Sequence, residues 1–175
     1  MLLYLHSFFA LLFLLQPNPK PQKDFLKTLQ KHHGKSYTGT VVTPLRANDP
    51  FAGKELRIFI QKAGEDSLRV PFWVGEDKSR TWLLTFHKKN GLLLKHDHRH
   101  ADGSPDSVTM YGGYAKVGGT SLSHSFPADA YTAQLIPAAA TNEWTLQLSP
   151  NKKVLSYILK RDGQLRFQAD FKLED

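Results

Sequence analysis

Apolar and polar residues alternate at every second position over most of the chain after Tyr37. The alternation is clear in LRIFI (56–60), LRVPFWV (68–74), EWTLQL (143–148) and LRFQADFKL (165–173). A period of two is typical of strands with one buried face. About nine or ten such segments at short spacing predict an antiparallel meander, closed into a barrel or folded as a sandwich. We therefore predict an all-β protein, an antiparallel up-and-down β-barrel of about eight to ten strands with a short N-terminal helix.

The helix is predicted over residues 24–35, DFLKTLQKHHGK. Asp24 is a suitable cap, and Gly34 is a suitable end. Phe25, Leu26 and Leu29 fall on one side of such a helix, which would pack against the strands.

The N-terminal stretch, MLLYLHSFFALLFLL, is apolar and is followed by the proline-rich QPNPKPQ. The apolar run is shorter than the ~20 residues that a membrane-spanning helix needs. We therefore expect residues 1–19 to be a signal peptide or signal anchor, and residues 20–175 to form a single β-barrel domain. This predicts a secreted or periplasmic protein with no stable membrane span after signal cleavage.

The amino-acid composition excludes some kinds of functional site and disfavours others. The chain has no cysteine, which excludes disulfides, catalytic thiols and thiolate metal sites. Its formal net charge is +7, but lysine and arginine are scattered and never occur in a run longer than a pair. This pattern favours a solvated basic surface over a nucleic-acid site.

Two glycine-containing turns predict how strands pair. The RDG turn (161–163) and the KNG turn (89–91) can each form a two-residue or a three-residue loop. Only the three-residue form puts apolar side chains opposite one another, because a slip of one residue moves a strand's side chains to the other face. The predicted pairs are Leu159 with Leu165, Tyr157 with Phe167, Phe86 with Leu94, Leu84 with His96, and Trp82 with His98.

A ladder of histidines continues the strand that begins at Gly91. His96, His98 and His100 share their parity with Leu92 and Leu94, so we expect them on the apolar, inward face. By the same argument His124, between Leu122 and Phe126, points inward.

Three interpretations of this histidine ladder remain open. The rings can hydrogen-bond to backbone or water at the barrel rim. They can form the polar part of a ligand cavity with aromatic walls. They can also bind Zn²⁺ or Cu²⁺, because imidazoles two residues apart on a strand are able to share a metal ion. The candidate ligand-binding residues are Trp82, Phe86, His96, His98, Tyr111 and His124. The candidate metal ligands are His96, His98 and His100.

No motif predicts an enzyme. GKS (34–36) lacks the glycine that a phosphate-binding loop needs at position 29, where Leu29 stands. G-x-S-x-G and H-E-x-x-H are both absent, and no nucleophile–base pair can be named. ADGSPD (101–106) has turn composition, and YGGY (111–114) predicts a bulge or sharp bend that closes the barrel.

The architecture expected over residues 24–173 resembles the calycins, which include lipocalins, fatty-acid-binding proteins and nitrobindins. The stretch LLLKHDHRHADGSPDSVTMYGG (92–113) is similar to one found in a family of uncharacterised secreted bacterial proteins. The first resemblance implies a barrel around a cavity, and the second implies export without a known activity.

We therefore expect an exported, non-enzymatic barrel that binds a small, partly apolar molecule in its interior. The alternatives are a periplasmic metal-binding protein that uses the His96, His98 and His100 ladder, and an interaction module with a filled barrel. The oligomeric state is left open by the sequence.

Overall fold

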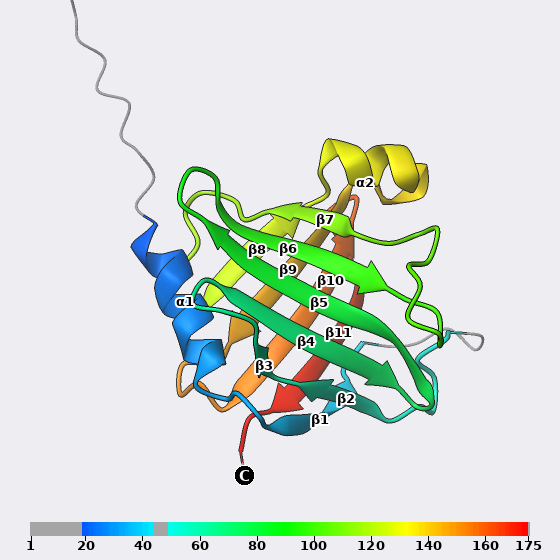
Figure 1. Cartoon of the computed structure of the whole chain (residues 1–175), viewed down its shortest axis with the longest axis horizontal. Helices are drawn as coiled ribbons and strands as arrows, with labels where there is room; N and C mark the ends of the chain where they lie inside the picture. Colours follow the sequence, from blue (N-terminus) through cyan, green and yellow to red (C-terminus); the bar gives the residue numbers. More distant parts are fainter. Residues whose placement is uncertain (1–18, 44–48, 175) are drawn as a thin grey trace, which may run out of the picture.

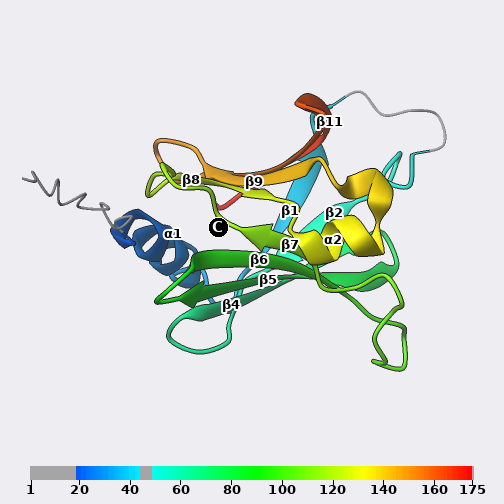
Figure 2. The same ribbon diagram turned by 90° about the horizontal axis from the view of Figure 1, so that it is seen from above.

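The computed structural model describes residues 19–43 and 49–174, and these form a nearly closed antiparallel β-barrel (Figures 1 and 2). The predicted all-β barrel with a short N-terminal helix is confirmed. The predicted signal segment falls almost entirely outside the described residues. Among the helices described, none has the length and apolar character needed to cross a bilayer.

Over the described residues the fold contains three helical segments and eleven strands. The helical segments are α1 (Lys20–Gln30), α2 (Ala130–Leu135) and the 3-10 helix η1 (Pro137–Ala139). The strands are β1 (Ser36–Val41), β2 (Leu56–Phe59), β3 (Gln61–Lys62), β4 (Ser67–Val74), β5 (Asp77–His87), β6 (Gly91–His98), β7 (Tyr111–Tyr114), β8 (Ser123–Pro127), β9 (Asn142–Leu148), β10 (Val154–Arg161) and β11 (Gln164–Lys172).

The strands form one sheet in the order β7-β6-β5-β4-β2-β1-β11-β10-β9-β8, with β3 paired to β4. The two ends of this order, β7 and β8, meet and nearly close the barrel. Next to this seam the Lys116 N–H donates to the Ser125 carbonyl at 2.8 Å, and the Asp129 N–H donates to the Gly112 carbonyl at 2.8 Å. Such closure satisfies backbone groups that a sheet edge would leave exposed.

The YGGY segment forms β7 itself, at this seam. A Cβ atom on Gly113 would lie 2.0 Å from the Pro127 carbonyl oxygen, so only glycine permits this approach of the two chains. The pair of glycines thus helps close the barrel, as predicted, although as an edge strand against β6 rather than as a bend.

Helix α1 differs from its prediction at both ends. It begins at Lys20 with Pro21 in its first turn, where a missing N–H costs nothing. Asp24 is therefore not the cap but lies inside the helix, 2.7 Å from the ammonium group of Lys20. The predicted apolar side is confirmed, because Phe25, Leu26 and Leu29 are all buried. Figure 2 shows α1 at one end of the barrel and α2 toward the other.

The RDG turn has a different form from the one predicted. Arg161 pairs with Gln164 across a two-residue turn in which Asp162 and Gly163 have positive φ angles of 53° and 72°. A β-bulge between Leu159 and Lys160 then shifts the register. The bulge absorbs the one-residue slip, so burial does not exclude the two-residue turn.

As a result Leu159 pairs with Phe167 and Tyr157 with Ala169, while Leu165 is 49% exposed. The predicted pairs of Leu159 with Leu165 and of Tyr157 with Phe167 are wrong.

The KNG hairpin is shifted by two residues from its prediction. Its loop is 88–90, and His87 pairs with Gly91. Trp82 therefore lies opposite His96 and not His98, whose partner is Arg80. The other predicted pairs are also shifted, with Phe86 opposite Leu92 and Leu84 opposite Leu94. A shift of two preserves the face of every side chain, so the predicted inward face is still correct.

Candidate functional site

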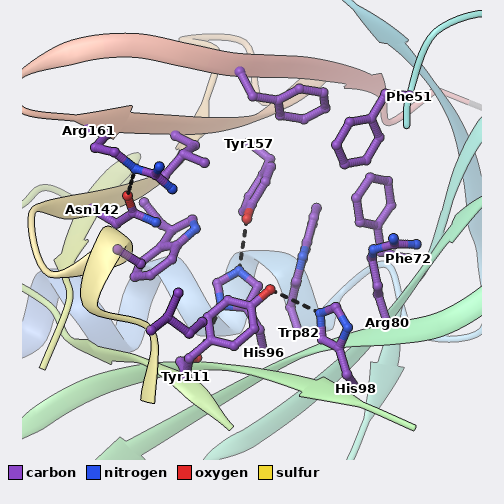
Figure 3. A pocket seen from close by; sticks show the side chains of 15 residues that line it. Phe51, Phe72, Arg80, Trp82, His96, His98, Tyr111, Asn142, Tyr157 and Arg161 are labelled. Atoms are coloured by element: carbon purple, nitrogen blue, oxygen red, sulfur yellow. Dashed lines mark hydrogen bonds between the residues drawn. The ribbon is translucent and has the colours of Figure 1, made fainter. Parts of the chain in front are cut away.

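A cavity of about 260 Å³ lies inside the barrel and is bounded in part by η1 and the residue before it. Figure 3 shows its lining side chains converging from both sides of the barrel. The apolar part of the wall consists of Phe51, Phe72, Trp82, Ile136, Ala139, Trp144, Leu159 and Phe167. The polar part consists of Arg80, His96, His98, Tyr111, Asn142, Tyr157 and Arg161.

His96 lies at the base of this cavity and uses both of its ring nitrogens. Nδ1 is 3.2 Å from the carbonyl oxygen of Tyr111, and Nε2 is 2.9 Å from the hydroxyl of Tyr157 (Figure 3 shows the second bond). A carbonyl can only accept, so Nδ1 carries the proton and donates. Nε2 therefore accepts from the Tyr157 hydroxyl, and the neutral imidazole is fully hydrogen-bonded.

Burial fixes the charge state of this pair. Burial lowers the pKa of His96 to about 3. The hydrogen bond to the Tyr111 carbonyl raises this pKa, but by less than burial lowers it. Burial also raises the pKa of Tyr157 well above its ordinary value. Both groups are therefore neutral over the physiological range.

A second pair, His98 and Tyr111, lies beside the first. The Tyr111 hydroxyl is 3.0 Å from Nε2 of His98, and the Tyr111 ring stacks on His96 with centroids 4.7 Å apart. Burial, followed by the charge of Arg80, lowers the pKa of His98. Burial raises the pKa of Tyr111 to about 12. The histidine face therefore presents neutral aromatic surface to the cavity.

The aromatic wall is built around Trp82. Its ring stacks on Tyr157 with centroids 4.5 Å apart and planes 17° from parallel. Trp144, from β9 on the other side of the barrel, packs against His96 at 5.0 Å. Two of the protein's three tryptophans thus line the cavity, which makes their fluorescence a direct reporter of its contents.

Two arginines that the sequence analysis did not select also line the cavity. The Arg80 guanidinium is 2.5 Å from the Asp77 carboxylate, whereas the Arg161 Nε donates to the Asn142 side-chain oxygen at 2.8 Å. Strand alternation could have found them, because Arg80 is an even number of residues from Trp82, and Arg161 is an even number from Tyr157. Lysine and arginine were expected on a solvated basic surface, and that expectation missed these two arginines.

Phe86 and His124 do not line this cavity. Both lie at the α1 end of the barrel, where the Lys23 ammonium sits 4.8 Å from the centre of the Phe86 ring and Phe25 meets His124 edge-on at 5.2 Å. Four of the six candidate ligand-binding residues therefore line the cavity, and the other two lie at the α1 end of the barrel. The four are Trp82, His96, His98 and Tyr111.

His124 is buried as predicted, but against helix α1. Within the described ranges, neither of its ring nitrogens has a hydrogen-bond partner. Burial lowers the pKa of His124. The backbone groups of Pro21 and Thr120 raise it, but by less than burial lowers it. A Cβ on Gly119 would lie 2.1 Å from Nδ1, so the ring is closely covered by chain.

The structure does not bring the three proposed metal ligands together. Strand β6 ends at His98, and His100 is exposed beyond it, where its backbone N–H donates to the Ser104 carbonyl at 2.9 Å. Among residues 19–43 and 49–174, no group of three or more His, Cys, Asp or Glu side chains could hold a metal ion. In the histidine ladder, His96 is thus buried, His98 is half-buried and His100 is exposed. The prediction placed His100 inside because it extended the strand past its end.

Comparison with known proteins gives no relative. No protein-family model, curated protein or solved structure matches the chain. The site is therefore interpreted from its own geometry.

Proposed function

We propose that this protein is an exported, calycin-type barrel of a single domain, residues 20–175, that binds a small, partly apolar molecule in its interior. The observation that carries the proposal is the cavity itself, lined by two tryptophans and by neutral, hydrogen-bonded imidazoles. A solidly packed interior would have favoured the interaction module, and a three-histidine cluster would have favoured the metal-binding protein.

The cavity size limits the ligand. An apolar cavity of ~150 Å³ binds benzene, and sites for drug-sized molecules begin at ~300 Å³. At about 260 Å³ this cavity suits a molecule of one or two rings. Stacking against Trp82 and Trp144 is the main attraction that such a wall offers.

Binding, not catalysis, suits the polar groups. His96 already uses both nitrogens, and Tyr157 and Tyr111 are neutral, so no side chain among them serves as an activated base or nucleophile. Polar side chains that are already hydrogen-bonded to one another stabilise the barrel and fix the shape of the cavity wall.

Titration calorimetry with neutral indole tests the binding proposal. Ala139 lines the cavity and Ala140 next to it is exposed, so Ala139→Phe fills the space and Ala140→Phe is the matched control. We expect indole to bind wild type and Ala140→Phe equally and to bind Ala139→Phe at least about tenfold more weakly, since the ring occupies the ligand's volume. Equal binding to all three proteins, or none to any, would refute interior binding.

Export is tested separately by fractionation of a Gram-negative host. The full chain is expected in the periplasm, and a chain that begins at Lys20 is expected in the cytoplasm, because the apolar N-terminal run would direct secretion. Retention of the full chain in the cytoplasm would contradict the export part alone.

A further inference from the structure

We propose that the ligand of this cavity is a small aromatic acid whose anionic group binds Arg161. This inference rests on the proposed function and specifies its ligand class. It is carried by an uncompensated cation in a cavity wall that, over the described residues, contains no carboxylate.

Arg161 is held in place by a neutral group. Its Nε donates to the Asn142 side-chain oxygen at 2.8 Å, from the neighbouring strand β9, and Asn142 itself is only 5% exposed. In the part of the chain that the structure describes, no carboxylate lies within ion-pair distance of Arg161. The adjacent Asp162 instead accepts from the Thr141 hydroxyl at 2.7 Å and faces Arg166 at 4.0 Å.

Arg80 provides the contrast. It also lines the cavity, but its charge is balanced by the Asp77 carboxylate at 2.5 Å. In Figure 3 the two arginines lie on opposite sides of the cavity, with the aromatic side chains between them. One side of the cavity thus has a balanced charge and the other has a net positive charge.

The free hydrogen-bonding groups near Arg161 are donors. Because a guanidinium can only donate, the Asn142 atom that it contacts is the oxygen, and the amide nitrogen of Asn142 is left to donate elsewhere. No partner for that nitrogen exists among the described residues. The terminal nitrogens of Arg161 likewise have no partner within residues 19–43 and 49–174. A carboxylate accepts from both neighbours at once, and its bond to a guanidinium is charge-assisted.

His96 does not compete with Arg161 for this role. His96 is saturated by the Tyr111 carbonyl and the Tyr157 hydroxyl, so it has no donor to offer. An acid therefore places its ring against Trp82, Tyr157 and Trp144 and its charge at Arg161. A cationic ligand of the same shape meets an unpaired positive charge and no carboxylate.

Three molecules with the same ring system test the proposal by titration calorimetry near pH 7. They are indole acetate, which is anionic, indole acetamide, which is neutral, and tryptamine, which is cationic. We expect the acid to bind at least about tenfold more tightly than the amide, equivalent to about 1.4 kcal/mol, and the amine to bind most weakly. In Arg161→Met the affinity for the acid falls to that for the amide, whose own affinity changes little.

Arg166→Met is the matched control. Arg166 is exposed on the same hairpin and does not line the cavity, so its loss should leave the ratio of acid to amide affinity unchanged. An equal loss in both variants would mean that general surface charge attracts the acid, and this would overturn the assignment to Arg161.

The outcomes separate the two proposals. Equal affinity for acid and amide in wild type overturns the ligand class while leaving interior binding intact. No binding of acid, amide or neutral indole overturns both. The comparison of acid with amide uses wild-type protein, so it decides the question even if Arg161→Met fails to fold.

Discussion

Acidification is expected to destabilise this barrel through the buried His96. The ring titrates near 6.5 in an unfolded chain and near 3 in the fold, because burial opposes the charged form. Between these values the unfolded chain binds one more proton than the folded chain, so falling pH favours unfolding. The stabilisation from the neutral ring is complete above about pH 6.5 and is lost progressively toward about pH 3.

The size of the effect follows from this shift. One proton corresponds to about 1.4 kcal/mol per pH unit, and the unfolded ring is already half protonated at about pH 6.5. A fall from about pH 6.5 to about pH 4.5 therefore removes about 2 kcal/mol from the free energy of unfolding. This is a large part of the 5–15 kcal/mol that typically stabilises a domain. His98 and His124 change stability in the same direction, since burial lowers the pKa of both. Carboxylates such as Asp77 and Asp129 contribute only at lower pH, because their pKa values are held below 3.8.

Urea unfolding followed by tryptophan fluorescence measures this dependence, since Trp82 and Trp144 are buried. His96→Phe keeps an aromatic ring between Tyr111 and Trp144, and its slope of stability against pH should fall by about one proton relative to wild type. The variant also leaves the Tyr157 hydroxyl without its acceptor, which costs about 1–3 kcal/mol at every pH. His100→Gln, at an exposed position, should retain the wild-type slope. If His96→Phe also retained it, the assignment of the lost proton to His96 would be refuted.

Two further predictions concern the barrel ends and seam. Gly113→Ala should lower the free energy of unfolding by about 1–3 kcal/mol, because its Cβ would lie 2.0 Å from the Pro127 carbonyl oxygen. Gly103→Ala, which has a positive φ but no neighbour within 4 Å of its Cβ, should cost less, and equal losses in urea unfolding would argue against a tight seam. Phe25→Ala should cost about 3–5 kcal/mol, because Phe25 is fully buried where α1 covers the barrel. The exposed Lys27→Ala in the same helix should change stability by less than about 0.5 kcal/mol, and a comparable effect of the two would show that α1 is not part of the core.

The histidine ladder illustrates how far local pattern reaches. Alternation put His96 and His98 on the face of Leu94, and His96 is indeed 4% exposed beside Leu94 at 0%. Alternation gives no information about where a strand ends, so His100 was placed inside although β6 stops at His98. It also gives no information about position along the barrel. Phe86 shares the inward face with Trp82, yet it lies at the α1 end and outside the cavity.

Arg80 and Arg161 show a second limit of prediction from local sequence pattern. Their parity placed them inward, but an unpaired charge is costly to bury, and composition argued for the surface. The pairing of β10 with β9 brings Asn142 to Arg161, whereas Asp77 and Arg80 lie three residues apart in β5. These partners make the two positions tolerable, but only the Asn142 partner of Arg161 depends on long-range strand pairing.

The sequence by itself determined the class of fold, the inward face of nearly every strand and the apolar side of α1. These features depend on periods of two and of about four residues, which are local and survive any shift of register by an even number. The tertiary structure alone decided the registers of the two hairpins, the pairing of YGGY with β6, and the division of the inward face into a packed end and a cavity. Those features depend on a bulge, on backbone approach and on contacts between distant strands. GLLLKHDHRH is thus a strand whose histidines contribute to a cavity wall up to His98 and leave the barrel at His100.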